Sequence, residues 1–143
     1  MFERIMVTGA GGPGAVNLCR SLLTINPRPW ILAVDASEYY VHLALGHARA
    51  VVPRCDETST YIEAINSLVR KHRIDFILPN NSLEIRVLSE HREALEAPVF
   101  LPEVPALDIS NSKWESYGAF KKAGLPVPET HLLSNPQELD SVF

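Results

Sequence analysis

The sequence lacks the features that mark a secreted, membrane or nucleic-acid-binding protein. Its two cysteines, Cys19 and Cys55, lie far apart and form no C-x-x-C pair. The apolar run at the N-terminus is short and leads straight into glycines, unlike a signal peptide, and no run approaches the roughly 20 residues of a membrane span. There is no basic block, and the net charge is −4. We therefore expect a cytoplasmic protein with reduced thiols, and neither nucleic acid nor a membrane as its partner.

A metal site is also not expected, because the five histidines are scattered. His42 and His47 are five positions apart, which does not put them on one face of a helix. The cationic run 70–73 stands where a helix should end, and there it complements the helix dipole. With 143 residues, 46% of them hydrophobic and 21% charged, the chain has the composition of an ordinary globular domain with a core.

Glycines dominate the start of the chain. Gly9, Gly11 and Gly14 fit G-x-G-x-x-G between an apolar run at 5–7 and an amphipathic segment, a pattern typical of a strand, a tight loop and a helix. Such a loop can turn backbone amides and a helix N-terminus toward an anionic group. It can equally serve only to pack the first helix closely against the first strand. The motif alone leaves both interpretations open.

Apolar runs and helical patterns then alternate along the chain. We expect strands at 5–7, 30–34, 50–52, 75–79 and 99–101, with helices after the glycine loop, from a capping box formed by Thr60 and Glu63, and from a second capping pair formed by Asn81 and Glu84. This alternation predicts an α/β fold: a Rossmann-like five-stranded parallel sheet with helices on both faces.

Ligands of such sheets bind beyond the carboxyl ends of the strands. Asp35 lies 21 positions after Gly14, where an acid can meet a ribose hydroxyl, although it can also cap the segment 37–45 that follows it. The residues expected to bind a small-molecule substrate or an anion are Gly9, Gly11, Gly12, Gly14, Asp35, Asn80, Asn81 and Glu84. Arg54 falls at the same rim. No catalytic residue is assigned.

The last third of the chain follows another pattern. Residues 112–123 predict a helix that ends at Gly124, and Pro126 and Pro128 make a stiff extended exit. Residues 130–133 predict a strand, and Ser134 or Asn135 starts a new helix with Pro136 in its first turn. A strand and a helix with nothing to pack against suggest a truncated chain or the beginning of a second domain. We expect a first domain over 1–125, and a linker with the start of another domain over 126–143.

The segment 111–130 resembles the junction before the ATP-grasp domain in relatives of the carbamoyl-phosphate synthase large subunit. It begins with Asn111-Ser-Lys-Trp and ends with Phe120-Lys-Lys-Ala-Gly-Leu-Pro-Val-Pro-Glu-Thr130. The family string has an acid, Lys, Trp, a helix, and then Lys-x-x-Gly-Ile/Leu-Pro-Val-Pro-x-Thr. The opening Ile5-Met-Val-Thr-Gly-Ala-Gly-Gly-Pro13 and residues 75–79 are similar to the same family. The resemblance implies a pre-ATP-grasp domain, a Rossmann-like module that usually carries no dinucleotide.

In that family, ATP and Mg²⁺ bind in the following domains, which a partner subunit or the rest of a longer chain would supply. Some relatives bring the lysine that matches Lys113 close to the ATP phosphates, although a solvated residue in a first helical turn would look the same. Two departures put the acceptor substrate in doubt: Ser112 replaces an acid, and Ser82 replaces the aspartate of Thr-x-Asp-Glu-Glu-Leu, while Glu84 matches. The resemblance implies an ATP-dependent ligase that joins a carboxylate to an amine or a similar nucleophile. Assembly as a homodimer stays open.

A short-chain dehydrogenase is the alternative. Its support is the loop at Thr8–Gly12, Asp35 as a ribose ligand, and the Y-x-x-x-K spacing of Tyr117 and Lys121. Only 36 positions separate Asn81 from Tyr117, which is too few for the helix and strand that such enzymes place there. A non-catalytic binding module is a third interpretation that the sequence leaves open.

Overall fold

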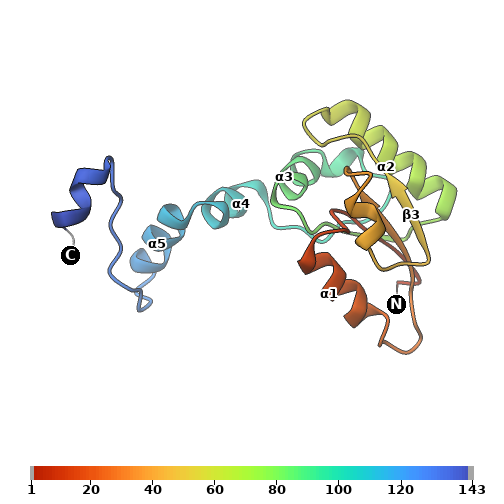
Figure 1. Cartoon of the computed structure of the whole chain (residues 1–143), viewed down its shortest axis with the longest axis horizontal. Helices are drawn as coiled ribbons and strands as arrows, with labels where there is room; N and C mark the ends of the chain where they lie inside the picture. The colour runs from red at the N-terminus through yellow and green to blue at the C-terminus, as the bar shows by residue number, and fades with distance from the viewer. Residues whose placement is uncertain (1, 142–143) are drawn as a thin grey trace. The chain divides into compact units, whose positions relative to one another are not determined.

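The computed structural model describes residues 2–141 and divides the chain into two compact units, residues 1–102 and 103–143. Figure 1 traces the chain through both units. Among the described residues, no helix is both long and apolar enough to cross a membrane.

A four-stranded parallel sheet forms the centre of the first unit. Its strands are β1 (Arg4–Val7), β2 (Trp30–Asp35), β3 (Ala48–Val51) and β4 (Phe76–Leu78), in the order β3-β2-β1-β4. The two central strands are continuous apolar runs because both of their faces are covered. The α/β class and the parallel sheet are therefore confirmed.

The predicted fifth strand is wrong. In the described chain, residues 99–101 contribute only an isolated bridge between Val99 and Ile77, and the Ile77 amide donates to the Pro98 carbonyl over 2.9 Å. Prolines at 98 and 102 bracket this segment and have no N–H to donate. The segment therefore cannot extend a ladder along the edge of β4.

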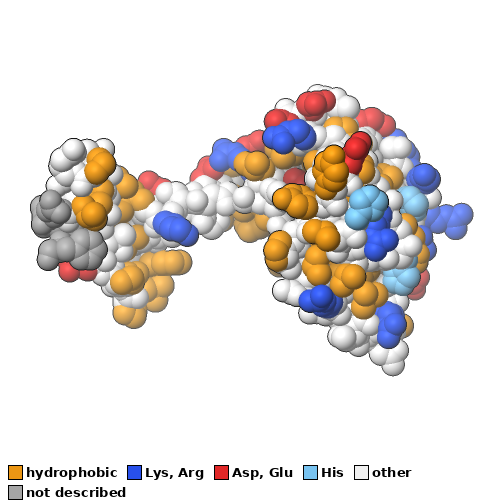
Figure 2. Space-filling model, in the orientation of Figure 1, with side chains coloured by type: hydrophobic (Ala, Val, Ile, Leu, Met, Phe, Trp, Pro, Cys, Tyr) orange, Lys and Arg blue, Asp and Glu red, His pale blue; other side chains and the backbone are white. Residues whose placement is uncertain are grey.

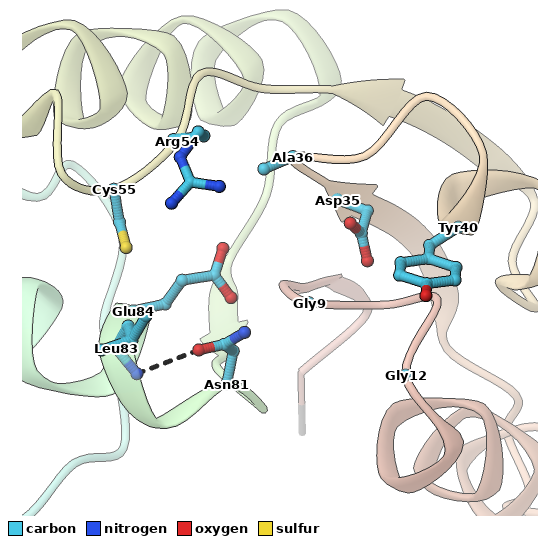
Figure 3. Close-up of a pocket in the computed structure, with 10 residues that line it drawn as sticks. All are labelled: Gly9, Gly12, Asp35, Ala36, Tyr40, Arg54, Cys55, Asn81, Leu83 and Glu84. Carbon is cyan, nitrogen blue, oxygen red and sulfur yellow. Dashed lines mark hydrogen bonds between the residues drawn. The ribbon is translucent and has the colours of Figure 1, made fainter.

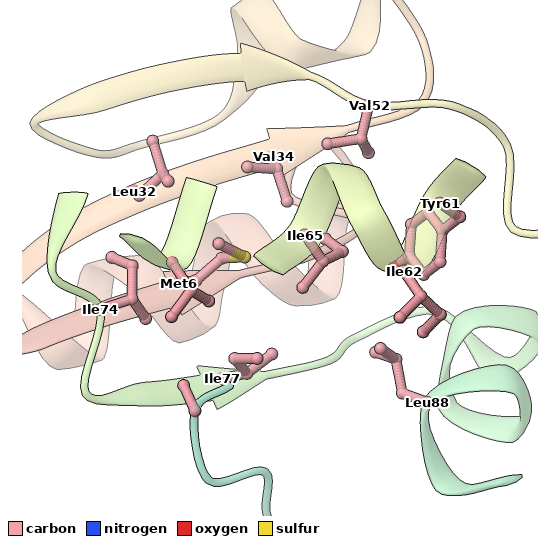
Figure 4. Packing of buried hydrophobic residues seen from close by; sticks show 12 residues of the cluster. Met6, Leu32, Val34, Val52, Tyr61, Ile62, Ile65, Ile74, Ile77 and Leu88 are labelled. Atoms are coloured by element: carbon pink, nitrogen blue, oxygen red, sulfur yellow. The ribbon is translucent and has the colours of Figure 1, made fainter. Parts of the chain in front are cut away.

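Helices cover the two faces of the sheet, as predicted. Helix α1 (Pro13–Leu22) packs on one face, while α2 (Thr58–His72) and α3 (Ser82–Glu90) pack on the other. Alternate strand residues supply the two cores, because successive side chains of a strand point to opposite faces. The first core contains Ile5, Val7, Ala15, Cys19, Ile31 and Ala33, and the second contains Met6, Leu32, Val34, Tyr61, Ile65, Ile77 and Leu88 (Figure 4).

Only one of the two predicted helix caps is found in the structure. Helix α2 begins two residues before Thr60, and Glu63 pairs with Arg70 over 2.8 Å instead of closing a capping box. Asn81 caps α3 as predicted, since its Oδ1 accepts from the Leu83 amide. Glu84 does not complete that capping pair, because its side chain turns into the protein. Residues 37–45 form only a short 3₁₀ turn, η1 (Tyr40–Leu43).

The second unit contains α4 (Val104–Asn111), α5 (Lys113–Lys122) and the 3₁₀ turn η3 (Pro136–Ser141). Helix α5 is confirmed: the Ser112 hydroxyl accepts from the Glu115 amide, and Gly124 follows the helix at φ +74°. Helix α4 was not predicted; its Pro105 lies in the first turn, where proline fits a helix. The predicted strand at 130–133 is wrong, because no described strand pairs with this segment.

Candidate functional site

A pocket of about 280 Å³ opens at the carboxyl ends of the strands in the first unit. The loops that follow β1, β2, β3 and β4 all contribute to it, as the parallel topology predicts. Figure 3 shows the residues that line it: Gly9, Gly12, Asp35, Ala36, Tyr40, Arg54, Cys55, Asn81, Leu83 and Glu84.

Each glycine of the G-x-G-x-x-G motif has a reason within the protein. Gly9 has φ +56°, and a Cβ there would lie 3.0 Å from both Asn81 Cβ and Glu84 Oε2. A Cβ at Gly11 would overlap the backbone carbonyl of Tyr40, and a Cβ at Gly14 would lie 3.0 Å from Asn80 Nδ2. Contacts between protein segments therefore account for the spacing without a nucleotide.

The amides of the glycine loop are also largely used inside the protein. The Ala10 amide donates to Val34 O over 3.0 Å, and the Gly12 amide donates to Gly9 O over 3.1 Å. The Gly11 amide donates to Asp35 Oδ2 over 2.9 Å. These three donors tie the loop to itself and to the end of β2, so they do not point at an anion in the pocket.

Asp35 connects two of the loops. While Oδ2 accepts from Gly11, Oδ1 accepts from the Ser37 amide over 2.9 Å. The carboxylate therefore stabilises the turn after β2 and holds the glycine loop beside it. Its contacts match neither a free ribose ligand nor a simple helix cap.

Glu84, which lines the pocket, belongs to a buried group of three side chains with Thr8 and Tyr61. Glu84 is 5% exposed; its Oε2 accepts from the Thr8 hydroxyl and its Oε1 from the Tyr61 hydroxyl, both over 3.0 Å. Burial raises the pKa of the Glu84 carboxyl, the two hydrogen bonds oppose that rise, and Asp35 adds to it. Burial and then the charge of Glu84 raise the pKa of Tyr61.

The two partners of Glu84, Thr8 and Tyr61, were not predicted from the sequence. Tyr61 lies on the buried face of α2 among aliphatic residues, and only the fold brings its hydroxyl to Glu84. A tyrosine among aliphatic core positions was the available signal, because a buried hydroxyl normally has a hydrogen-bond partner.

Arg54 and Cys55 form the wall that follows β3. Arg54 pairs with Asp56 over 3.2 Å, but both side chains are exposed, so the pair is weak. The guanidinium extends over the pocket in Figure 3. Burial and the charge of Glu84 raise the pKa of the Cys55 thiol. The pocket thus combines one guanidinium and one carboxamide with two carboxylates that already hold internal donors.

The structure gathers most of the predicted site residues. Gly9, Gly12, Asp35, Asn81 and Glu84 line the pocket, while Gly11, Gly14 and Asn80 are not part of its lining. Lys113 belongs to the second unit, where it is exposed at the first position of α5. Tyr117 and Lys121 also lie on α5 and are joined by a hydrogen bond of 3.1 Å from Nζ to the phenol oxygen. Residues 2–141 contain no group of three or more His, Cys, Asp or Glu placed to hold a metal ion.

Comparison with known proteins identifies the family of this chain. Residues 14–99, more than half of the chain, match the model of the family described as PylC-like, N-terminal domain. The chain belongs to the PylC-like N-terminal domain family. A search of curated protein sequences gave no match.

Several solved structures share the fold of this PylC-like domain. Glycinamide-RNase-transformylase T from Mycobacterium tuberculosis is 19% identical with a TM-score of 0.58, and the match covers 98% of this chain and 38% of that one. An L-amino acid ligase from Bacillus licheniformis is 12% identical with a TM-score of 0.59, over 94% of this chain and 36% of that one. The biotin carboxylase domain of the 2-oxoglutarate carboxylase of Hydrogenobacter thermophilus is 18% identical with a TM-score of 0.57, and the match covers 99% of this chain and 32% of that one.

Neighbours of this kind are ATP-grasp enzymes, and the recognition of a pre-ATP-grasp domain is confirmed. At these identities the likeness establishes the fold alone. The chain spans about a third of the length of the enzymes it matches.

Proposed function

We propose that this PylC-like domain is the substrate-side, Rossmann-like domain of an ATP-dependent ligase that joins a carboxylate to an amine or a thiol, as in relatives of carbamoyl-phosphate synthase. The observation that carries the proposal is the pocket at the carboxyl ends of four parallel strands, in a domain of this family. Structural neighbours that include an L-amino acid ligase support the general kind of reaction. The pocket would hold the acceptor substrate, a small molecule.

Arg54 and Asn81 are the residues we assign to substrate contact. The Arg54 guanidinium faces the pocket and can bind an anionic group of the substrate in a forked arrangement. Because Asn81 Oδ1 already accepts from Leu83, its amide nitrogen is the group that remains to donate. Asp35 and Glu84 hold the loops that shape the pocket and give it negative charge. The glycines, which were predicted to bind an anion, would instead shape the pocket, because the amides of residues 10–12 already donate to oxygens within the protein.

ATP and Mg²⁺ would bind outside this pocket, in ATP-grasp domains supplied by a longer chain or by a partner subunit. The Hydrogenobacter thermophilus structure is a complex with MgADP, ADP and bicarbonate, which supports a nucleotide and a magnesium ion in proteins of this fold. We retain Lys113 as a ligand of the ATP phosphates, and 1–125 with 126–143 as the division of domains. A cytoplasmic location and a homodimer belong to the same proposal.

Titration of the ¹⁵N-labelled chain by NMR tests the pocket. Small amines that carry a carboxylate or phosphate should shift the amides at 9–12, 35–36, 54–55 and 81–84, and Arg54→Gln should weaken the response. Arg86→Gln, a change of another exposed arginine outside the pocket, is the matched control. If no such compound shifts these amides, or if both variants respond alike, the pocket is not the acceptor site.

The assignment of ATP to other domains has its own test. The purified chain should not hydrolyse MgATP. Turnover at the rate of an intact ligase would show that this chain carries a complete nucleotide site and would contradict the proposed division of labour.

A further inference from the structure

A second pocket lies at the opposite end of the same sheet, where β1 and β2 begin. It has a volume of about 460 Å³ and is lined by Phe2, Glu3, Arg4, Pro27, Arg28, Pro29 and Trp30. The strands of the sheet separate it from the pocket at Gly9 and Asp35, since Arg4 and Trp30 are the first residues of their strands. Nothing in the proposed ligase function uses this end of the domain.

Arg4 is held in place at one side of this pocket. Its guanidinium carbon lies 4.0 Å from the centre of the Trp30 ring, and its Nε donates to the His72 carbonyl over 2.5 Å. The rings of His72 and His47 stack on Trp30, with centroids 5.5 Å and 6.0 Å away. Because Nε and the ring fix the guanidinium, its two Nη groups are pre-oriented, and they make no hydrogen bond with the described residues.

Arg28 supplies a second guanidinium. It stands between Pro27 and Pro29, whose fixed φ angles stiffen the segment, and it forms no ion pair with the described residues. Phe2 and the two prolines give the wall an apolar part. Two guanidinium groups in a pocket with a partly apolar wall suit an organic anion that presents a forked set of oxygens.

The acidic residues nearby only partly offset this charge. Both oxygens of Asp75 accept backbone amides, those of Glu3 and Arg4, over 2.7 Å and 3.1 Å. Glu3 lines the pocket and is the one carboxylate in that lining. Burial lowers the pKa of His72, and the positive charges of Lys71 and Arg4 lower it further, which agrees with a positive field here. On the face drawn in Figure 2, Lys, Arg and His side chains gather at the margin that carries the N mark in Figure 1.

We propose that the pocket formed by Arg4, Arg28 and Trp30 binds a phosphate monoester that has an apolar body. The two guanidinium groups hold the phosphate, and Phe2 with the prolines covers the apolar part. The site is independent of the acceptor pocket, so a ligand here is an effector or a second small-molecule partner of the domain.

Trp30 allows a direct test with phenyl phosphate as the probe. The chain has two tryptophans, and Trp114→Phe leaves Trp30 as the only one. In that variant, phenyl phosphate should change the Trp30 emission in a saturable way, while phenol, which lacks the charge, should not. Absence of saturation, or an equal response to phenol, would overturn the proposal.

Substitutions that remove a positive or a negative charge from the pocket provide the control. Arg28→Gln, in an exposed loop, should weaken phenyl phosphate binding by about tenfold, the loss of one charge-assisted hydrogen bond. Glu3→Gln should tighten binding, and Arg54→Gln in the acceptor pocket should leave it unchanged. Equal affinity for inorganic phosphate would contradict the apolar part of the site. An unchanged affinity in Arg28→Gln would contradict the site itself.

Discussion

The glycine loop and helix α5 carry the two clearest signals in the sequence, and the structure treats them in opposite ways. In the loop, each glycine of the motif meets neighbouring protein atoms at close range. In α5, none of the residues is buried, and Trp114 and Phe120 are both exposed. The motif that looks like a ligand site is therefore explained by packing, whereas packing within its own unit does not explain the segment that resembles the ATP-grasp junction.

This contrast separates two meanings of a motif. A G-x-G-x-x-G spacing is sufficient evidence for a strand, a tight turn and a helix, because Gly9 has a positive φ and Gly11 lies against the Tyr40 backbone. It is not evidence for a dinucleotide. The resemblance of 113–130 to a family junction depends on residue identities that burial does not demand, so it carries more information about kinship.

The largest difference between the regions should appear when a methyl group is added. Gly11→Ala should lower the free energy of unfolding by about 3 kcal/mol, since the new Cβ meets the Tyr40 backbone, which cannot move without η1. Gly118→Ala in α5 is the matched control: nothing lies near its Cβ, so the change should stabilise the helix by about 1 kcal/mol. Urea unfolding followed by Trp30 and Trp114 fluorescence measures both. A Gly11→Ala variant as stable as the parent would break the comparison.

A pair of leucines tests burial in the two units. Leu88 is fully buried against the sheet, and Leu88→Ala should cost about 3 kcal/mol. Leu125, which follows α5, is 53% exposed, and Leu125→Ala should change stability by less than about 0.5 kcal/mol. Thermal unfolding of both variants gives the comparison. Similar losses would mean that the second unit is packed more tightly than its exposed side chains indicate.

Helix caps offer a smaller test. Asn81 caps α3 and Ser112 caps α5, each by accepting one backbone amide, so alanine at either position should cost about 1 kcal/mol of local helix stability. Only Asn81→Ala should affect the unfolding of the sheet, because α3 contributes Leu88 to its core. Hydrogen exchange of amides in β1 and β4 distinguishes the two. Faster exchange in Ser112→Ala as well would show that the units unfold together.

The pH dependence of stability should be the weakest signal. Burial places the pKa of Glu84 in the folded chain above its usual value of 4.5, so the folded state holds this proton more tightly than the unfolded state. The protonated carboxyl therefore stabilises the folded state at pH values below 4.5, and this stabilisation is lost as the pH rises through the raised pKa of Glu84. Glu84→Gln should remove that decline from a series of urea titrations. A decline of the same size in the variant would assign it to other groups.

Much of the first unit was predictable, for a physical reason. Strands buried on both faces, such as β2, are continuous apolar runs, and α2 shows a clear helical period, so local sequence and tertiary environment agree. The fifth strand was predicted wrongly because the apolar run 99–101 has the composition of a strand, whereas the prolines on both sides of it interrupt pairing. Helix α4 and the false strand at 130–133 lie in the second unit, where few buried contacts decide between local preferences.

The site was predictable by position but not by contact. Asp35, Asn81 and Glu84 were predicted at one rim because the loops that follow parallel strands all lie at the same edge of the sheet. That Gly11 donates to Asp35, and that Tyr61 reaches Glu84 from α2, depends on distances that no sequence spacing contains. Arg54 was recognised at the rim, yet only the pocket geometry identifies it as a group that a ligand can meet.

Titration calorimetry with NADH and NADPH tests most directly the claim that the glycine loop serves the fold. The glycine loop, Asp35 and the parallel sheet, which support the dehydrogenase alternative, are all present in this chain. We predict no measurable binding of either cofactor, because Tyr40 packs over Gly11 and the oxygens of Asp35 already accept backbone amides. Micromolar affinity for NADH or NADPH would contradict this account and favour the dehydrogenase.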